Sequence, residues 1–335
     1  MIKKEKWNLE LSEYIKQGEP NQVEKTKTWE AAIGLQDVDG LKPSKYLIKT
    51  AKEHIEGTID IGEVKTRIDE YYEVQGGRKN FEKENEEADK VAVRTTEILS
   101  EKAFNFSLTE LLNIHKRLFI DIFDGAGVYR DYNITKKEWA LNRDTVTYAS
   151  FQSIKETLEY DFEQEKNFSY KGLSLDESIK HLCSFTANIW QIHPFCEGNT
   201  RTTAVFIIKY LRTFGFNIND EVFAENSWYF RNSLVRANYT NFPKNIFEDT
   251  SFLEKFFYNL LTNSKYELKN RYTNIDNAQS ADKNNLKCKK CTLEEQAIIN
   301  ILKVNSRATQ VEIAVRIGKS VRAVKHIWRK CKKKD

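Results

Sequence analysis

Apolar residues recur every three or four positions through most of the chain, which is the spacing of one face of an α-helix. With 4 prolines and 13 glycines among 335 residues, few positions interrupt this spacing. The pattern therefore predicts a mainly α-helical protein in which sheet is a minor component. The predicted helices cover residues 29–35, 44–55, 61–72, 108–123, 153–164, 175–190 and 200–214.

One segment departs from helical spacing. Between Trp139 and Tyr148, β-favouring residues flank the turn-forming run Asn142-Arg143-Asp144. This pattern predicts a short β-hairpin, and we call the segment 139–148 the flap.

The length of the chain suggests one main core with smaller additions at its ends. A polar stretch headed by Gly76-Gly77 is typical of a linker. At the far end, short helices are predicted over 294–303, 310–317 and 320–331. The predicted organisation is a leader (1–27), a small helical unit (28–75), a linker (76–89), the main domain (90–265), a second linker (266–291) and a C-terminal domain (292–335).

Composition narrows the class of protein. Apolar residues make up 40% and charged residues 30%, which suits a globular protein with a solvated surface. The N-terminal segment lacks the features of a secretory signal, and the longest apolar stretch, 204–208, is too short to span a membrane. Five cysteines, an odd number, suit reduced thiols. We therefore expect a cytoplasmic protein without a membrane partner; an oligomer stays open.

The helical pattern breaks at residues 192–198, and this break concentrates residues that suit phosphate chemistry. Asn199 is a good N-cap for the next helix, so the backbone amides around Gly198 are expected to bind an anion. Arg201 can grip a phosphate with its guanidinium. Glu197 offers an oxygen to Mg²⁺, which usually binds through a carboxylate and substrate phosphates.

His193 supplies a base at the start of the same loop. A histidine side chain, with an ordinary pKa of about 6.5, can accept the proton of an attacking hydroxyl. Transfer at phosphorus otherwise needs mainly positioning and neutralisation of charge. The same residues could form a plain connection between two helices. Finding a base, a carboxylate, an anion site and a cation within nine residues favours the catalytic interpretation.

This loop resembles the signature of the Fic family, His-x-Phe-x-Asp/Glu-Gly-Asn-x-Arg followed by a second arginine. The matching residues are His193, Phe195, Glu197, Gly198, Asn199 and Arg201. The segment 125–130, Gly-Ala-Gly-Val-Tyr-Arg, is similar to the family's approach to its flap, so the resemblance covers roughly residues 90–265. It implies a Fic-type helical bundle with a hairpin flap.

Fic proteins transfer AMP from ATP to Ser, Thr or Tyr hydroxyls, so the resemblance implies a Mg²⁺-dependent protein adenylyltransferase that can also modify itself. His193 would deprotonate the target hydroxyl, and Glu197 would hold Mg²⁺. The residues that would bind the donor phosphates are Gly198, Asn199, Thr200 and Arg201. The flap would add a strand to an extended segment of the target protein, with Leu141 and Thr147 as clamp positions.

The resemblance fails at Ala204, where the family has its second arginine, so the grip of that arginine on the γ-phosphate is absent. Arg236 and Asn238, on a later helix, are candidates to reach the nucleotide, and an exposed helical face is the alternative interpretation. A phosphotransferase relative replaces the Gly-Asn pair of the signature, so the retained Gly198-Asn199 favours nucleotidyl transfer.

Residues 28–73 resemble the antitoxin VbhA, a small helical protein that folds against Fic domains. In that family an inhibitory glutamate contacts the second arginine. Here the corresponding residue is Asp39, whose side chain is one methylene shorter, and the arginine is replaced by Ala204. We therefore expect Asp39 to inhibit the site only weakly, and we hypothesise that the unit has mainly a structural role.

The C-terminal end is basic. Residues 283–335 contain 15 Lys and Arg against 4 Asp and Glu, a net charge of +11, which leaves −7 for residues 1–282. Residues 308–327 resemble a helix-turn-helix or the start of a winged helix, whose charge suits contact with DNA phosphates. Such a module also packs against proteins, so both partners stay open. The residues expected to face a DNA groove are Ser320, Arg322, Lys325 and Arg329.

Cys288 and Cys291 have the spacing of metal ligands, but no second pair follows at the spacing of a zinc finger, which favours a linker with free thiols.

Two functions therefore compete. The first is a Mg²⁺-dependent protein adenylyltransferase. The alternative is a nucleotide-sensing, DNA-binding regulator with a catalytically weak Fic core. The pairing of His193 with Glu197 favours the enzyme, because sensing alone requires neither a base nor a metal ligand.

Overall fold

The computed structural model describes residues 6–73, 80–214, 218, 221–262, 264–277, 309–316, 321 and 324–325. The chain divides into two compact units, Met1–Ala278 and Gln279–Asp335. The prediction of a mainly helical protein is confirmed, because the described residues form helices and one isolated β-bridge, between Asn241 and Ile246. No helix in the described part of the chain combines the length and apolar character needed to cross a membrane.

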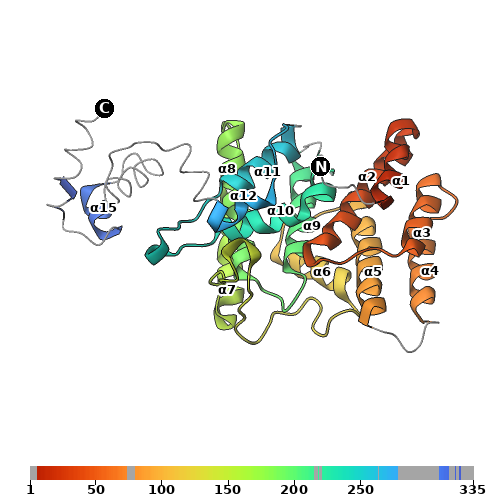
Figure 1. The fold of residues 1–335 in the computed structure, drawn as a ribbon, viewed down its shortest axis with the longest axis horizontal. Helices are drawn as coiled ribbons and strands as arrows, with labels where there is room; N and C mark the ends of the chain where they lie inside the picture. Colours follow the sequence, from red (N-terminus) through yellow and green to blue (C-terminus); the bar gives the residue numbers. More distant parts are fainter. Residues whose placement is uncertain are drawn as a thin grey trace. The chain divides into compact units, whose positions relative to one another are not determined.

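The first unit is a stack of helices, in which the long segment 120–138 joins α6 to η2 (Figure 1). Its α-helices are α1 (Lys6–Gln17), α2 (Pro20–Gly34), α3 (Lys45–Glu56), α4 (Ile61–Glu73), α5 (Asn80–Ser100), α6 (Leu108–Phe119), α7 (Ile154–Asn167), α8 (Leu175–Ile192), α9 (Asn199–Thr213), α10 (Glu221–Ala237), α11 (Ser251–Thr262) and α12 (Asn270–Thr273). Its 3-10 helices are η1 (Leu35–Asp39), η2 (Trp139–Leu141), η3 (Phe151–Ser153) and η4 (Phe242–Lys244).

The described part of the predicted leader, residues 1–27, is helical. Helix α1 and the first half of α2 lie there, and Leu11 is fully buried. Helix α2 begins where it does because Pro20 takes the first helical position and Glu19 and Gln22 form a capping box. The N-terminal helical unit is therefore longer than the sequence pattern indicated.

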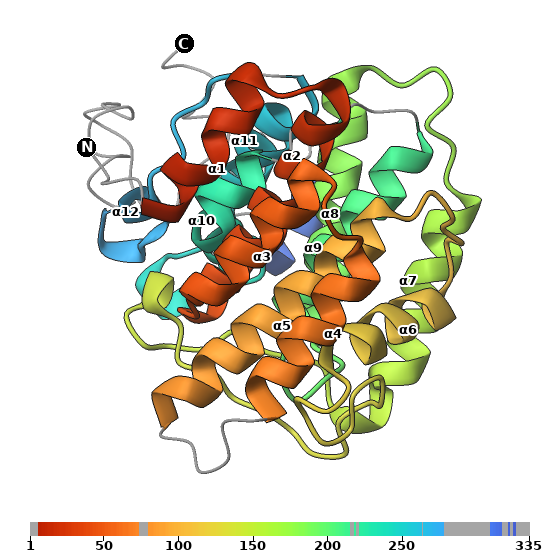
Figure 2. The same cartoon turned by 90° about the vertical axis from the view of Figure 1, so that its right-hand side faces the viewer.

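Helix α5 separates two hydrophobic cores. Ala92 and Val93 join the core formed with α2, α3 and α4, whereas Ile98 and Leu99 join the larger core of the remaining helices. Figure 2 shows α4 and α5 running side by side, as their packing requires. The predicted linker, residues 76–89, is helical from Asn80 onward, where α5 begins.

The N-terminal unit also touches the larger core directly. Leu35 of η1 is buried within that core, and Gly34 lets α2 approach α10 closely, since an added Cβ would lie 2.4 Å from the Cα of Ala224. Ser227 of α10 donates a hydrogen bond to the carbonyl of Gly34 at 2.7 Å. These contacts hold η1, and with it Asp39, against α10.

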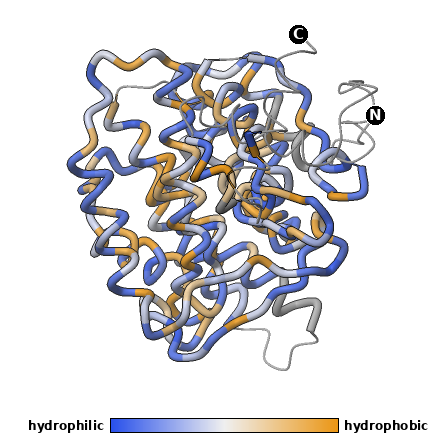
Figure 3. The backbone as a smooth tube through the Cα atoms, turned by 90° about the vertical axis from the view of Figure 1, so that its left-hand side faces the viewer, coloured by the Kyte–Doolittle hydropathy of each residue, from blue (hydrophilic) through white to orange (hydrophobic). Residues whose placement is uncertain are grey.

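The larger core lies around α8 and α9. Ten consecutive residues of α9, from Arg201 to Tyr210, are buried, as expected for a helix surrounded by others. The loops at the outer edge are mostly hydrophilic in Figure 3. In the first part of the predicted second linker, residues 266–291, the structure has helix α12, and Ile275 is 3% exposed within the core.

The second unit is described over fewer residues. Helix α15 (Gln310–Arg316) agrees with the predicted helix 310–317, and Thr309 and Glu312 cap its start through mutual hydrogen bonds. Ile313 and Val324 are fully buried. The predicted helix 294–303 and the cysteines at 288 and 291 lie outside the described residues.

Candidate active site

His193 is the residue at which helix α8 ends. It adopts a left-handed backbone conformation, with φ of 50°, which is uncommon for a residue with a side chain and turns the chain sharply into the loop. Its Nδ1 lies 3.2 Å from the carbonyl oxygen of Trp190. Because a carbonyl oxygen can only accept, Nδ1 carries the proton and Nε2 of the neutral ring keeps its lone pair.

The surroundings of His193 favour its neutral form. The residue is 3% exposed, and burial holds the pKa of its imidazole well below the usual 6.5. The positive charges of Lys136, Arg231 and Arg130 lower this pKa further, while the hydrogen bond to Trp190 opposes them. A neutral imidazole at physiological pH is the form that accepts a proton.

Arg130 fixes the loop from outside. Its Nε donates to the carbonyl of His193 at 2.8 Å, and its NH2 donates to the carbonyls of Ile192 and Ala149. The backbone amide of Arg130 also donates to the carbonyl of Pro194 at 2.8 Å. One buried guanidinium thus ties the end of α8 to the segments on either side of the flap.

The start of α9 differs from the prediction in one respect. Gly198, with φ of 73°, is the N-cap, and Asn199 is the first helical residue. The predicted capping role of Asn199 is wrong, because its side chain turns back to the loop, accepting from the amide of Phe195 at 2.9 Å and donating to its carbonyl at 2.7 Å. Asn199 therefore holds the loop in place, and Gly198 is the residue that caps the N-terminus of α9.

Thr200 and Arg201 follow on the first turn of α9. The hydroxyl of Thr200 accepts a hydrogen bond from the indole of Trp190 at 2.9 Å, which joins α8 to α9 beneath the loop. Arg201 is 2% exposed, and its guanidinium carbon lies over the Phe119 ring, 4.8 Å from the ring centre. Its guanidinium donates to Gln36 at 3.0 Å and to Glu87 at 2.6 Å.

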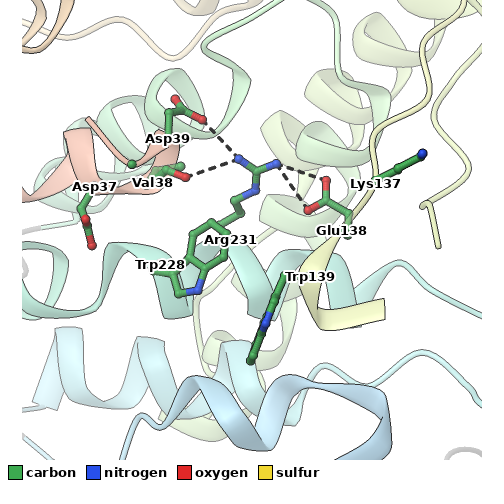
Figure 4. A pocket seen from close by; sticks show the side chains of 9 residues that line it. Asp37, Val38, Asp39, Lys137, Glu138, Trp139, Trp228 and Arg231 are labelled. Carbon is green, nitrogen blue, oxygen red and sulfur yellow. Dashed lines mark hydrogen bonds and ion pairs between the residues drawn. The ribbon is translucent and has the colours of Figure 1, made fainter. Parts of the chain in front are cut away.

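Asp39 contacts two arginines. Its Oδ2 lies 2.9 Å from Nε of Arg201, and its Oδ1 lies 3.2 Å from NH1 of Arg231 on α10 (Figure 4). The expectation that Asp39 faces a site without an arginine partner is therefore wrong. Ala204 is fully buried inside α9, and the cation that Asp39 meets in addition to Arg201 comes from a different helix.

Glu197 points outward from the loop, with its side chain 56% exposed, and its Oε2 pairs with Nζ of Lys136 at 2.9 Å. Among the described residues, no three His, Cys, Asp or Glu side chains gather into a metal site. One carboxylate nevertheless suits Mg²⁺, which takes its other ligands from phosphates and water. Glu197 fits this role, and Lys136 is the group with which a metal ion would compete.

Two predicted nucleotide contacts are engaged elsewhere. Arg236 is 4% exposed and donates to the carbonyl of Thr273 at 3.3 Å. Asn238 donates to the carbonyls of Ala187 at 3.1 Å and Leu234 at 2.9 Å. Both side chains thus join α10 to its neighbours, and the prediction that they reach a nucleotide gains no support.

The predicted hairpin of the flap is not confirmed. Residues 139–141 form the 3-10 helix η2, Asn142 and Arg143 have positive φ, and the hydroxyl of Tyr239 donates to Asp144 at 2.6 Å. Leu141 is fully buried in the larger core, so the prediction that it clamps a target gains no support. Thr147 is exposed and stays available for that role.

In the second unit, Lys325 is exposed. The other predicted groove residues, Ser320, Arg322 and Arg329, lie outside the described residues.

Sequence reasoning missed four residues that the structure brings to this site. Arg130, Lys136, Glu87 and Arg231 contact the loop residues or their partners. Arg130 is the last residue of the segment 125–130, which resembles the Fic family, so the sequence contained an indication of its importance. The others follow no motif, because their partners lie 61 to 192 positions away in the chain.

Residues 105–211 match the Fic/DOC family, and residues 295–335 match a winged helix-turn-helix, DNA-binding family. The chain is 28% identical over 158 residues to a protein named protein adenylyltransferase VbhT from Bartonella schoenbuchensis, covering 44% of this chain and 32% of that protein. It is 25% identical over 189 residues to a protein adenylyltransferase of Bartonella henselae, covering 51% and 33%. The chain thus spans about a third of the length of these curated relatives.

Among solved structures, a Fic family protein from Desulfovibrio desulfuricans G20 is similar at a TM-score of 0.43 and 14% identity, over 94% of this chain and 82% of that chain.

Proposed function

Because this chain carries a Fic/DOC domain and a C-terminal winged helix-turn-helix, we propose that it is an enzyme that transfers AMP from ATP to a Ser, Thr or Tyr hydroxyl of a target protein, itself included. The observation that carries the proposal is the state of His193, a buried neutral imidazole with Nδ1 bonded to Trp190 and Nε2 left as the base. A residue that merely joins two helices requires neither a fixed tautomer nor a lowered pKa.

The reaction is a substitution at phosphorus. The target oxygen forms a bond to the α-phosphorus of ATP as the bond from that phosphorus to pyrophosphate breaks, and pyrophosphate leaves with the electron pair. The hydroxyl proton passes to Nε2 of His193. The protein contributes mostly by positioning the reactants and by stabilising charge.

The start of α9 would bind the donor. Gly198 caps this helix, and Asn199 and Thr200 begin its first turn. The N-terminal amides of a helix have no partner within the helix, and such amides favour anions. Arg201 adds a fixed guanidinium next to this turn. Glu197 would hold Mg²⁺, which supplies neutralisation of phosphate charge when it is bound with the donor.

The target protein would dock at the flap. Thr147 is exposed beside the loop, and its carbonyl accepts a hydrogen bond from Gln191 of α8 at 3.1 Å. An extended segment can pair with exposed backbone in this region by adding a strand. Because Leu141 is buried, we assign the docking role to the residues that follow it, from 145 to 148.

The test is transfer of label from α-labelled ATP with Mg²⁺ to the protein itself and to lysate proteins. We expect His193→Ala to abolish the transfer while the protein stays folded. His181→Ala is the matched control, since His181 bonds to the buried Glu165 at 2.6 Å and lies outside the loop. Equal labelling by the wild type and the His193→Ala variant would refute the proposed base.

A second function is favoured by the match at residues 295–335 and by the exposed Lys325. We propose that the C-terminal domain binds DNA, which leaves open a nucleotide-sensing regulator as the alternative to the enzyme. Binding of the full chain to duplex DNA should weaken with rising salt and be lost on deleting residues 286–335. Binding that survives the deletion would place the DNA contact elsewhere.

A further inference from the structure

The strongest unassigned feature is the pair of guanidiniums that share the carboxylate of Asp39. Arg201 comes from α9 and Arg231 from α10, yet one oxygen of Asp39 approaches each of them, at 2.9 Å and 3.2 Å. Two guanidiniums that converge on one anionic group form the arrangement by which proteins recognise phosphate as well as carboxylate.

Each arginine is also held by a second carboxylate. Glu87 pairs with NH2 of Arg201 at 2.6 Å, and both oxygens of Glu138 lie within 3.3 Å of NH2 of Arg231 (Figure 4). Glu138 is buried, at 1% exposed. Both guanidiniums would therefore keep a fixed position if Asp39 withdrew.

Arg231 also has a donor to spare. Its Nε atom is buried and has no hydrogen-bond partner, whereas the Nε of Arg201 lies against Asp39 at 2.9 Å. A buried donor without an acceptor is costly for a protein, and such groups are usually satisfied by a ligand or by water. The unpaired Nε of Arg231 is therefore a second sign, independent of the shared carboxylate, that this guanidinium is built to meet a further acceptor.

We propose that Arg231 is a phosphate-binding residue of this site, and that Arg201 and Arg231 form a clamp for the pyrophosphate end of the nucleotide donor, which Asp39 occupies in this structure. The inference rests on the proposed AMP transfer. It gives the chain a second phosphate-binding cation although α9 has alanine at position 204.

The surroundings of Arg231 agree with this role. It lines a cavity of about 570 Å³ together with residues of η1, the flap and α10. Lys137 adds positive charge at the cavity, and Trp139 and Trp228 add aromatic surface, which suits a nucleotide (Figure 4). Arg231 also lies close enough to His193 for its charge to act on that imidazole.

The pyrophosphate end is the part assigned to the clamp because the α-phosphate must meet His193 and the start of α9. Negative charge grows on the leaving pyrophosphate as the bond to the α-phosphorus breaks, so two fixed guanidiniums there would stabilise the transition state. Asp39 must leave first, because its carboxylate neutralises the two arginines.

The experiment measures binding by the full chain of a non-hydrolysable ATP analogue, pyrophosphate and AMP. We expect Asp39→Ala to bind the analogue and pyrophosphate more tightly than the wild type. Adding Arg231→Ala should weaken both by about 10- to 100-fold, the typical effect of losing one charged hydrogen-bonding partner of a phosphate. AMP, which lacks the pyrophosphate end, should bind equally to both variants.

Two further variants separate a phosphate contact from a structural effect. In the Asp39→Ala background, Arg231→Lys keeps the charge without the planar fork and should give intermediate affinity. Arg271→Ala removes an exposed arginine of α12 and should change nothing. Thermal unfolding of each variant identifies any that fails to fold, and the Arg231→Lys result then decides.

The outcomes are distinct. Unchanged affinity for the analogue and pyrophosphate after Arg231→Ala, or no binding of either by Asp39→Ala, would overturn the clamp. Equal losses for AMP and the analogue would also overturn it, because the effect would then be general. Tight, Arg231-dependent binding without any transfer of AMP would sustain the clamp and refute the proposed function.

Discussion

Gly198 is the position where the architecture of the loop is most easily tested. It has φ of 73° and ψ of 6°, and a Cβ added there would lie 2.4 Å from Cε2 and Cζ of Phe119. The Phe119 ring cannot retreat freely, because it is fully buried and packs against His115 and Arg201. Gly198→Ala therefore combines backbone strain with a steric clash.

Gly40 provides a control with almost the same backbone. Its φ is 73° and its ψ is 12°, but an added Cβ would meet nothing within 4 Å. Strain alone is roughly 1–2 kcal/mol for a left-handed residue with a side chain, and overpacking a core adds roughly 1–3 kcal/mol. We expect Gly40→Ala to lower the free energy of unfolding by the first amount and Gly198→Ala by the sum, roughly 2–5 kcal/mol.

The assay is urea unfolding followed by tryptophan fluorescence. Both glycines lie within Met1–Ala278, which also holds five of the six tryptophans, so the main change in signal comes from the unit that carries the substitutions. Phe119→Leu should rescue part of the Gly198→Ala loss, so the double variant should be more stable than the sum of the two single losses implies. Equal losses for Gly40→Ala and Gly198→Ala, or strictly additive behaviour with Phe119→Leu, would show that the loop does not press against this ring.

Four further predictions concern single residues. Because the pKa of His193 is held well below 6.5, the base stays deprotonated as pH falls, so the rate of AMP transfer should be flat between pH 8 and pH 6.5; a decline with a midpoint at 6.5 contradicts this. Asn199→Ala removes both bonds to the Phe195 backbone and should abolish transfer and lower the free energy of unfolding by about 1–3 kcal/mol in urea. Lys136→Ala frees Glu197 and should lower the Mg²⁺ concentration that gives half-maximal transfer; an unchanged requirement argues against competition. Burial raises the pKa of Asp89 from 3.8 to about 6, so its contribution to stability is full below pH 4 and is lost as pH rises to 6; Asp89→Asn should remove this dependence, measured by urea unfolding at pH 4 and pH 7.

The helices were predictable where local signals agreed. The helix predicted over 44–55 is α3, because apolar residues repeat at helical spacing between a serine cap and a glycine at the end. Helix α5 was missed at its start because residues 80–90 are mostly polar. Their polar side chains serve distant partners: Asp89 accepts from Ser44 and Tyr72, and Glu87 pairs with Arg201. By composition alone, such a polar stretch of helix cannot be distinguished from a linker.

The flap shows the opposite error. The β-favouring residues 139–148 predicted a hairpin, but a lone hairpin is marginally stable and gains from a partner strand. In this chain the polar groups of the segment form hydrogen bonds with distant residues instead of with a second strand. Asp144 accepts from Tyr239, and the carbonyl of Trp139 accepts from Asn274. These partners lie 95 and 135 residues later in the chain, where no local pattern points to them.

The pairing of Asp39 shows why a signature residue and its chemical role can separate. From the sequence, alanine at position 204 indicated that the charge had been lost and that the aspartate had no partner. Arg231 is 192 residues from Asp39, and Gly34 lets α2, which leads directly into η1 and Asp39, approach α10 closely. The long side chain of an arginine on a neighbouring helix can bring the same charge to the same carboxylate. A motif describes where a residue stands along the chain, whereas binding depends on where its charge lies in space.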